Sequence, residues 1–476
     1  MKRLPWFPLL LLLPLSAAAD ADGQQWMTVL LDGRKVGHAL SERLEIDGKV
    51  QSRQRLELIL ERSGTRLQVN SDETAIESAT GQPLSFRGEA VLAGDVRRYS
   101  GEVDDLGMLT VVLESAGSRD VRTMPWPKGA LLAEGQRLAL AAAEAGEQTT
   151  LSMRVYLTDA LQAADLHITF AGHEEVAMPE AGHVRLRRVE KVLDTGEGQL
   201  PTQAWIDADL RTLRIRMPVF GTFLEMLECS QECALAPVQP SDLMERTLVR
   251  APRSIPRAWL SRPVQYRLRA LDGQPLELPG TAEQEVRLDH EAWTVAVRPG
   301  RSRDDETPPT EVFTRPNRWI ESDAAEIVAL AASAAQGSDD PQETMLRLER
   351  AVRRHIEVKS LRVGYASALE SYRRREGDCT EHALLLAALG RARGIPTRIA
   401  TGLVHADSFG GQRHVFVPHA WTQAWIDGRW VSFDAAQEGF GSGHIQLGSG
   451  DGEPWQFYQG VNQLGRIRIE AAQRLR

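Results

Sequence analysis

Hydrophobic and polar residues alternate along most of the first half of the chain. From Trp26 to about Pro237 the sequence consists of short segments with an apolar residue at every second position, separated by Gly and Asp. This period of two, broken by polar turns, predicts an antiparallel sheet with one solvated face. Residues 27–31, 54–60 and 213–217 are examples. We therefore expect a β-rich N-terminal domain over residues 20–240.

The stretch from Pro252 to Pro316 differs from its surroundings in composition. It is rich in Pro, Arg and acidic residues, and it contains one segment with strand-like alternation at residues 264–268. Such a composition is typical of an interdomain connection that carries a few strands. We predict a connecting segment over residues 241–316.

The hydrophobic pattern takes on a helical period after Arg318. Apolar residues recur every three or four positions in residues 323–336 and 341–356, which predicts two amphipathic helices. We interpret both as packing helices without a chemical role. They open a C-terminal domain over residues 317–476, so the predicted fold class is α+β, preceded by the antiparallel β-rich region.

The first 19 residues have the arrangement of a secretory signal peptide. Lys2 and Arg3 precede an apolar run that ends at Leu15, and small residues follow up to Ala19. The run is too short for a permanent membrane helix, and no Cys near the cleavage point suggests a lipid anchor. We predict cleavage after Ala19 and a periplasmic or secreted protein without a stable membrane span. A retained membrane anchor is the alternative.

Composition and charge narrow the class of protein. The 476 residues should form two or three domains. Hydrophobic residues at 42 % and charged residues at 25 % are close to the average of folded soluble proteins, which argues against disorder and against a polytopic membrane protein. Removing Lys2 and Arg3 changes the net charge from −9 to −11. Such an acidic chain is a poor candidate for binding nucleic acid.

Three cysteines in an exported chain leave one without a partner. Cys229 and Cys233 are four positions apart, a spacing that can close a small disulfide in a turn or helix but not along an extended strand. Two ligands of a metal site are the other interpretation of this pair. Cys379 is then the free cysteine.

Cys379 follows a turn and precedes a run of apolar residues. The sequence Glu376-Gly377-Asp378 leads to Cys379, and residues 383–389 are apolar on every side, which predicts a buried central helix that begins near Cys379. The positive end of the helix dipole favours a thiolate, and free N–H groups there can bind an oxyanion. A buried structural cysteine is the alternative.

Two alternating runs surround Asp427-Gly428 and predict a hairpin. With a two-residue loop, Ile426 faces Arg429 and Asp434 lies diagonally across from His419, at roughly 7–8 Å between backbones. The two side chains can therefore hydrogen-bond. A carboxylate that fixes one imidazole nitrogen leaves the other to activate a nucleophile. A three-residue turn would instead put Asp434 on the other face.

Four sequence blocks together resemble the bacterial transglutaminase-like core. They are Gly-Asp-Cys-Thr-Glu-His-Ala at 377–383, Ala-Arg-Gly-Ile-Pro-Thr-Arg at 392–398, His-Ala-Trp at 419–421 and Trp-Val-Ser-Phe-Asp at 430–434. The resemblance covers about 140 residues. It implies a papain-like α+β fold with Cys379 as nucleophile, His419 as general base and acid, and Asp434 as the residue that orients His419.

One position departs from the family pattern. Gln423 stands where the family commonly has Glu. A neutral amide still hydrogen-bonds, so this departure concerns the handling of substrate more than the triad. We predict that Trp421 and Gln423 bind substrate. No local motif marks the second donor of an oxyanion hole.

A metal site is a weaker interpretation of the histidines. His382 could join His414 or His419, but the sequence offers neither paired cysteines nor a helical pair of histidines. We predict no metal and no cofactor, and place His382 on the helix near the site. Residues 405–416 include Gly410-Gly411, and we interpret them as a loop, either a flap over the cleft or a plain surface loop.

The sequence leaves three functions to distinguish. A cysteine hydrolase that acts on a peptide or carboxamide bond is preferred, because water outcompetes amines unless an acceptor is bound. The same acyl enzyme with an amine acceptor would crosslink proteins. The third is a non-catalytic scaffold in which the β-rich region binds an envelope protein partner or an apolar ligand. A protein or peptide substrate is expected in the first two.

Overall fold

The alternating segments of the N-terminal half form one long sheet. The computed structural model describes residues 23–475 except 63–64, 93–94, 116–117, 197–198, 220–221, 240–246, 272, 274, 302–305, 360–365 and 453–462. The predicted signal peptide lies outside the described residues. The chain divides into two units, Met1–Asp242 and Leu243–Arg476, and each is described by itself.

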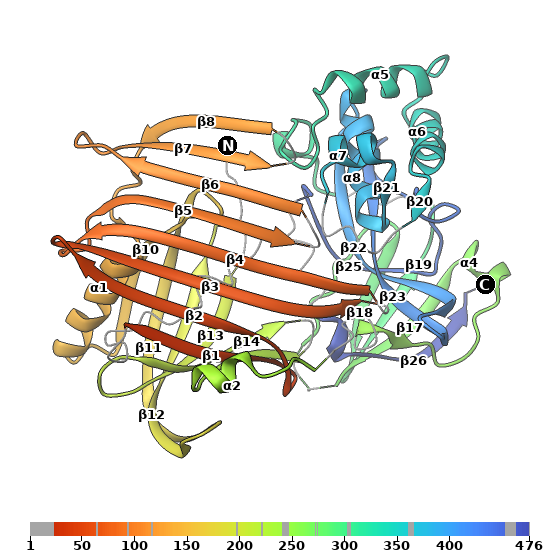
Figure 1. Ribbon diagram of the computed structural model, residues 1–476. Helices are drawn as coiled ribbons and strands as arrows, with labels where there is room; N and C mark the ends of the chain where they lie inside the picture. Colours follow the sequence, from red (N-terminus) through yellow and green to blue (C-terminus); the bar gives the residue numbers. More distant parts are fainter. Residues whose placement is uncertain are drawn as a thin grey trace. The chain divides into compact units, whose positions relative to one another are not determined.

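The sheet of the first unit has 15 strands, in the order β8-β7-β6-β5-β4-β3-β2-β1-β15-β14-β13-β12-β11-β10-β9. Neighbours pair antiparallel except β9 with β10. β1 pairs with β15 to join two consecutive meanders, and the first of these, β1 to β8, is seen in Figure 1. The predicted β-rich antiparallel region is thereby confirmed. The strands are β1 (Gln24–Leu31), β2 (Arg34–Ile46), β3 (Lys49–Arg62), β4 (Thr65–Ser78), β5 (Pro83–Leu92), β6 (Asp95–Val103), β7 (Met108–Ser115), β8 (Ser118–Pro125), β9 (Ala130–Leu131), β10 (Thr150–Leu157), β11 (Gln162–Met178), β12 (Gly182–Asp194), β13 (Gln199–Ile206), β14 (Thr212–Val219) and β15 (Thr222–Glu228).

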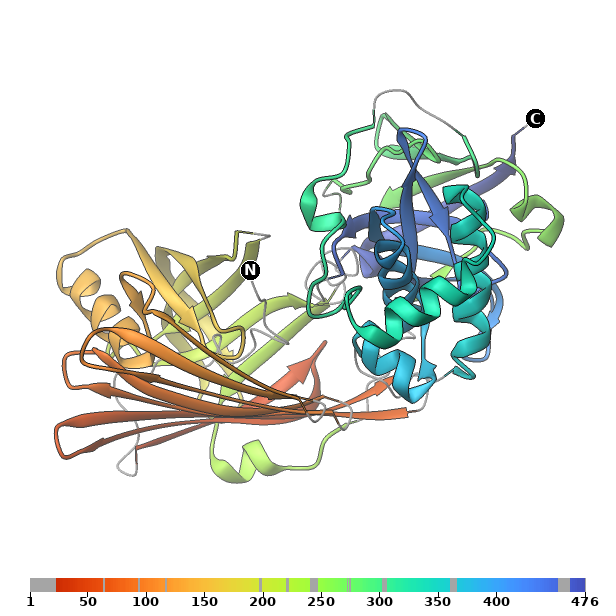
Figure 2. The same cartoon turned by 90° about the horizontal axis from the view of Figure 1, so that it is seen from above.

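This sheet curls so that strands of its two meanders face each other, as Figure 2 shows from above. Phe86 and Tyr99 from the first meander share a buried cluster with Tyr156 from the second. The ring centroids of Phe86 and Tyr156 are 5.5 Å apart, and those of Trp126 and Tyr156 are 4.7 Å apart. Aromatic contacts between the meanders thus hold the curled sheet together.

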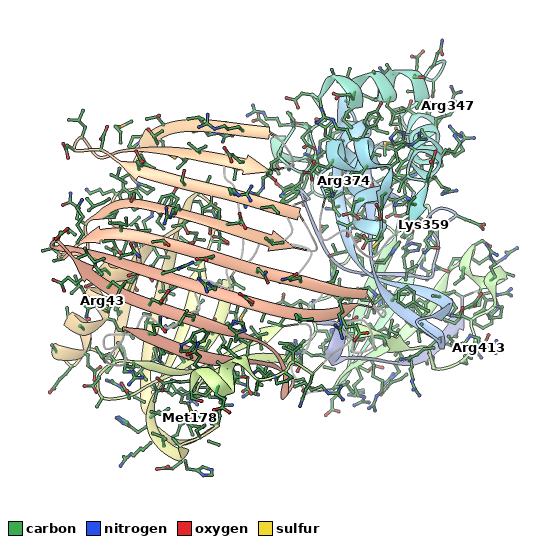
Figure 3. The ribbon with its side chains drawn as sticks, viewed as in Figure 1. Arg43, Met178, Arg347, Lys359, Arg374 and Arg413 are labelled. Atoms are coloured by element: carbon green, nitrogen blue, oxygen red, sulfur yellow. A yellow bond between two sulfur atoms is a disulfide. The ribbon has the colours of Figure 1, made fainter. Side chains whose placement is uncertain are left out.

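Helix α1 (Ala133–Ala145) is fixed to the sheet at its N-terminus. The carboxylate of Glu77 accepts hydrogen bonds from the backbone N–H groups of Glu134 and Gly135, at 2.6 and 2.9 Å. Burial raises the pKa of Glu77 to about 7. Arg43, labelled in Figure 3, donates two hydrogen bonds of 2.9 Å to the buried carboxylate of Glu134. Charged groups on β4 and β2 therefore anchor this helix.

Two glycines of the first meander lie beneath aromatic rings of the neighbouring strand. Gly88 pairs with Tyr99 and Gly101 pairs with Phe86 across β5 and β6. A Cβ atom on Gly101 would lie 2.3 Å from two atoms of the Phe86 ring, and one on Gly88 would lie 2.3 Å from the Tyr99 ring. Glycine at these positions leaves room for buried rings above the strand.

We predict that Gly101→Ala destabilises the first unit because the buried ring of Phe86 must move. The free energy of unfolding should fall by about 1–3 kcal/mol, the usual cost of overpacking, measured by urea denaturation. Gly172→Ala is the matched control, because no atom lies within 4 Å of the added Cβ in strand β11. Its effect should stay within about 0.5 kcal/mol. Equal effects of the two substitutions would contradict the prediction.

The second unit combines a helical layer with three sheets. A five-stranded sheet has the order β16-β23-β22-β25, with β24 paired to β23; a four-stranded sheet has the order β18-β19-β17-β26; and β20 pairs with β21. The strands are β16 (Val249–Arg250), β17 (Val264–Ala270), β18 (Gln284–Asp289), β19 (Ala292–Val297), β20 (Val358–Lys359), β21 (Glu376–Gly377), β22 (Thr397–Phe409), β23 (Gln412–Ile426), β24 (Arg429–Phe433), β25 (His444–Gly450) and β26 (Ile467–Arg474).

Helix α8 (Cys379–Ala392) is the centre of the helical layer. Residues 380–391 are buried, and the helix contacts β22, β23, α5, α6 and α7. The central buried helix and both helices predicted before it are confirmed. Among the described residues, the other helices are α2 (Gln231–Leu235), α4 (Arg257–Leu260), η2 (Glu311–Phe313), α5 (Ala325–Ala334), α6 (Pro341–His355), α7 (Ala368–Arg374) and η3 (Leu464–Arg466). Within the described ranges, none of them is long and apolar enough to cross a membrane.

Two segments differ from the sequence-based expectation. The predicted connecting segment, as far as it is described after residue 246, lies within the second unit, where β17 pairs with the C-terminal strand β26. The distant partner of β17 could not be recognised from local composition. Residues 405–416, predicted as a loop, are instead the ends of β22 and β23, joined at Gly410-Gly411.

Candidate active site

Three neighbours of Cys379 build the start of α8. The carboxylate of Asp378 accepts a hydrogen bond from Thr380 N at 2.8 Å. It also accepts one from the backbone N–H of Glu381, whose own carboxylate accepts from Asp378 N at 2.8 Å, and these two reciprocal bonds form a capping box. A Cβ atom on Gly377 would lie 2.4 Å from Glu381 Cβ. Glycine is therefore required there if Glu381 is to fold back over the helix start.

Cys379 is the first residue of this helix and is half-buried, unlike the buried residues that follow it. Its thiol lies at the positive end of the helix dipole, where anionic sulfur is stabilised. Backbone N–H groups of a first helical turn have no partner within the helix. This placement suits both a nucleophilic thiolate and the binding of an oxyanion.

The hairpin that carries His419 has the predicted register. Ile426 pairs with Arg429 and Gln423 pairs with Ser432. The two loop residues have positive φ, at 50° for Asp427 and 77° for Gly428, as a tight two-residue hairpin turn requires. Because the loop has two residues, the diagonal relation of His419 and Asp434 follows from the register.

The carboxylate of Asp434 meets the imidazole of His419 directly. His419 Nε2 lies 2.8 Å from Asp434 Oδ2, and both side chains are buried. The other carboxylate oxygen accepts hydrogen bonds from the backbone N–H groups of Ala436 and Gln437, at 2.9 and 3.1 Å. Nδ1 of His419 is left for the thiol, and the side chain of Cys379 is close enough to hydrogen-bond with the ring. Cys379, His419 and Asp434 are thus brought together.

The ionisation of this group follows from its surroundings. Burial lowers the pKa of His419, but the charges of Asp434 and Cys379 and the hydrogen bonds to both outweigh it and raise the pKa to about 10. Burial raises the pKa of Asp434, but the charge and hydrogen bond of His419 and the hydrogen bond of His444 hold it well below its usual range. The imidazolium and carboxylate forms are therefore favoured together.

The direction of each shift fixes its effect on stability. Because the pKa of His419 is raised from 6.5 to about 10, its protonation contributes fully below pH 6.5, and the contribution is lost as the pH rises through about 10. Because the pKa of Asp434 is depressed below 3.8, its ionisation contributes above that pH, and the contribution is lost in acid.

His444, which the sequence analysis missed, also binds Asp434. Its Nε2 lies 2.9 Å from Asp434 Oδ2, and its Nδ1 lies 3.0 Å from the backbone oxygen of Gly441. Its ring packs against Phe440 and Trp421, at centroid distances of 4.7 and 5.2 Å. His444 begins β25, and no local pattern marks it; pairing with β22 brings it to the site.

Helix α6 supports the backbone at Asp434, although its hydrophobic pattern predicted only a packing helix without a chemical role. The carboxylate of Glu349 accepts a hydrogen bond from Asp434 N at 2.9 Å, and Arg353 donates to Asp434 O at 3.2 Å. Lys359, labelled in Figure 3, donates to Ala436 O at 2.7 Å. These contacts hold the chain where it leaves β24. The only signal in the sequence was a pair of charged residues on an amphipathic helix.

Trp421 and Gln423 are placed as supports of the site. Each side chain is 1 % exposed. The ring of Trp421 stacks on that of His419, with 6.3 Å between the ring centroids, and its Nε1 donates a hydrogen bond to Ser432 Oγ at 3.3 Å. Gln423 accepts from Arg398 Nε at 2.7 Å and donates to Ser432 and to Gln446, both at 3.1 Å. This burial does not support the predicted contact with substrate. The hydrogen bonds also explain why Gln423 stands here and not Glu. Its amide N–H donates to Ser432 and Gln446, and an ionised carboxylate has no proton to donate.

The described histidines form two groups that meet the distance requirement for a metal ion: His419 with Asp434 and His444, and His405 with Asp407 and His414. In the first group both ring nitrogens are at hydrogen-bond distance from one carboxylate oxygen, so hydrogen bonds account for its geometry. His382 belongs to neither group. It is buried on α8, and its Nδ1 lies 2.6 Å from Asp378 O.

Cys229 and Cys233 lie in the first unit, where the structure joins them in a disulfide. Helix α2 begins between them, with Ser230 as its N-cap residue accepting a hydrogen bond from Cys233 N at 3.2 Å. The helical turn brings the two Cα atoms within 5.9 Å. Cys379 is the free cysteine of the chain.

The fold and the site define an α+β domain in which Cys379 is the first residue of a buried helix and His419 lies on the adjoining sheet. Residues 328–435 match the family described as the transglutaminase-like superfamily. This part of the chain is therefore a transglutaminase-like domain, as the sequence blocks predicted, and a strand-rich region precedes it. No curated protein matches the chain.

Several solved structures are similar to the chain at low identity. A candidate cysteine protease from Cytophaga hutchinsonii is 17 % identical over 46 % of this chain and 84 % of its own, with a TM-score of 0.29. A β-barrel-like protein from Brucella abortus, a domain of unknown function, is 12 % identical over 44 % of this chain and 95 % of its own, with a TM-score of 0.35. The periplasmic domain of TgpA from Pseudomonas aeruginosa is 19 % identical over 40 % of this chain and 82 % of its own, with a TM-score of 0.27.

We predict that Glu349 acts by holding the backbone at Asp434. Glu349→Ala leaves the buried N–H of Asp434 without its acceptor, which should lower the free energy of unfolding by about 1–3 kcal/mol and slow alkylation of Cys379. Glu349→Gln keeps an acceptor oxygen and should restore most of the stability and most of the alkylation rate. Urea denaturation measures the first, and the rate of reaction with iodoacetamide measures the second.

An exposed position on the same helix provides the control. Glu343→Ala removes a surface pair with Arg347 and should change stability by less than about 0.5 kcal/mol, without effect on alkylation. If Glu349→Gln were as damaging as Glu349→Ala, the role assigned to the acceptor oxygen would be wrong.

Proposed function

We propose that the chain is an exported cysteine enzyme that hydrolyses a peptide or carboxamide bond through Cys379, His419 and Asp434. The observation that carries this proposal is the arrangement around His419, whose Nε2 is bound by Asp434 while the thiol of Cys379 is near enough to its ring to raise the pKa of the imidazole. A buried imidazole placed between a carboxylate and a thiol at a helix start is the arrangement required for nucleophilic catalysis.

The first step is attack of the Cys379 thiolate on the substrate carbonyl. The carbonyl carbon gains a bond to sulfur, and its oxygen becomes an anion that the backbone N–H of Cys379, at the start of α8, can receive. The imidazolium of His419 then protonates the leaving amine, the C–N bond breaks, and an acyl thioester remains on Cys379.

The second step returns the enzyme to its starting state. His419, now neutral, takes a proton from water, and the resulting hydroxide attacks the thioester carbonyl. The carboxylic acid leaves, and the sulfur regains its thiolate form beside the imidazolium. Asp434 keeps the ring orientation constant in both steps because its Oδ2 binds Nε2 throughout.

An amine acceptor in place of water would give transamidation from the same acyl enzyme. Hydrolysis is proposed because water is always present, whereas an amine must be bound to compete. Export rests on the arrangement of Lys2, Arg3, the apolar run and Ala19. A protein or peptide is the proposed substrate, and the β-rich unit is proposed to bind an envelope protein partner.

Intact-mass analysis tests the nucleophile. The folded protein is exposed to a library of thiol-directed peptide amides, and we expect one adduct, which peptide mapping places on Cys379. Cys379→Ser should give no adduct. His419→Asn should slow adduct formation by roughly 10²–10⁴-fold, the usual contribution of acid–base catalysis. His290→Asn, a change at an exposed histidine of the same unit, should have no effect.

The reaction type is tested with any substrate that forms the adduct. Water should release the acyl group as a carboxylic acid, and added primary amine should divert only a minor share into amide. Amide as the main product at low amine concentration would favour the crosslinking alternative. No adduct on the folded wild-type protein across the whole library would favour a non-catalytic scaffold.

A further inference from the structure

The tip of the β22–β23 hairpin carries a second cluster of histidines. The strands pair from Thr397 with Ala424 outward to Phe409 with Gln412, and Gly410 and Gly411, both with positive φ, form the turn. By the same register, Asp407 lies across from His414, and His405 is two positions before Asp407 on the same strand. Two histidines and one carboxylate therefore come together on one short ribbon.

The side chains of this cluster converge. One possible ligand atom from each of His405, Asp407 and His414 lies within 4.8 Å of the other two. His405 is 8 % exposed, His414 is half-buried and Asp407 is exposed. The cluster is therefore closed on its inner side by the protein and open to solvent on the side of the carboxylate.

Two nitrogens of the cluster have no partner among the described residues. His405 Nε2 and His414 Nδ1 are both buried, and no protein group within hydrogen-bond reach satisfies them. Buried polar atoms are satisfied in the great majority of cases, and an exception indicates an additional ligand, an ion or a function. Both exceptions here belong to imidazoles, the commonest metal-binding side chain.

The backbone at His414 shows a further departure. Its φ is 54°, in the left-handed region that residues other than glycine rarely adopt. The hairpin turn does not require this conformation, because Gly410 and Gly411 form the turn on their own. Strained backbone persists where the surroundings or a function hold it, and here it accompanies a side chain with an unsatisfied nitrogen.

We propose that His405, Asp407 and His414 bind a divalent transition metal ion of the zinc type. Two imidazole nitrogens and one carboxylate oxygen are ligands that zinc accepts, with water in the fourth position. Ligands at 2.0–2.2 Å in a tetrahedron are about 3.3–3.6 Å apart. Because the atoms already lie within 4.8 Å, modest side-chain rotations complete the site.

The proposed metal site is separate from the candidate active site. His419 pairs with Gly402, and His405 is three residues further along β22, which corresponds to roughly 10 Å along the strand. A bound ion would tie β22 to β23 near their shared turn. We therefore assign the ion a structural role, in which it holds the outer part of the ribbon that also carries His419.

Zinc binding by the full chain is the direct test. Protein stripped with a chelator is titrated with Zn²⁺ alone in competition with a chromophoric chelator, and Co²⁺ is used as a spectroscopic probe. We expect one tight Zn²⁺ equivalent and a Co²⁺ visible spectrum typical of tetrahedral coordination. His414→Asn, which keeps a residue that tolerates positive φ, and Asp407→Asn should each weaken binding by at least about 10- to 100-fold.

Variants at metal-binding side chains outside the proposed site, including the free thiol, test whether zinc binds at the proposed site. Cys379→Ser and His444→Gln remove groups from the candidate active site, and His290→Asn removes an exposed histidine; all three should leave zinc affinity unchanged. Near-UV circular dichroism shows whether each variant is folded, and Asp407, being exposed, can be changed without disturbing the core. The proposal is overturned if wild type binds no zinc, if His414→Asn binds it as tightly, or if binding is lost with Cys379→Ser or His444→Gln.

Discussion

The second unit depends on the hydrogen bonds that the buried carboxylate of Asp434 accepts. One of its oxygens accepts from two imidazoles, at 2.8 Å from His419 and 2.9 Å from His444, and the other accepts from two backbone N–H groups. A buried charge is costly unless it is paired and hydrogen-bonded. Here four donors stabilise the ionised form, and the same donors fix the orientation of the ring that faces Cys379.

Several distant segments are needed to build this arrangement. The two-residue turn at Asp427-Gly428 sets the parity that places Asp434 diagonal to His419, and a slip of one residue would turn the carboxylate to the opposite face. β25 supplies His444, α6 supplies the acceptor for Asp434 N, and the start of α8 supplies Cys379. The proposed chemistry thus requires the whole unit to be folded around one carboxylate.

The features that could be predicted from sequence are those encoded in local spacing. The turn at residues 376–378 and the apolar run after Cys379 predict where α8 begins, and alternation around Asp427-Gly428 predicts the register, so the geometry of the site was accessible from two short segments. His444 and Glu349 were not, because each reaches Asp434 only through pairing and packing that join elements far apart in the chain. The burial of Gln423 likewise depends on Arg398 and Gln446, which no local pattern relates to it.

The central claim is that Asp434 holds His419 in its protonated form beside Cys379. Histidine-selective NMR of the imidazole nitrogens, assigned with His419→Asn, measures this directly. The account predicts that the ring of His419 stays doubly protonated until the pH approaches about 10. It also predicts that Asp434→Asn lowers this pKa, because burial is then opposed by Cys379 without the carboxylate. A wild-type ring that loses its proton near pH 6.5, or one that titrates identically in Asp434→Asn, would contradict the account.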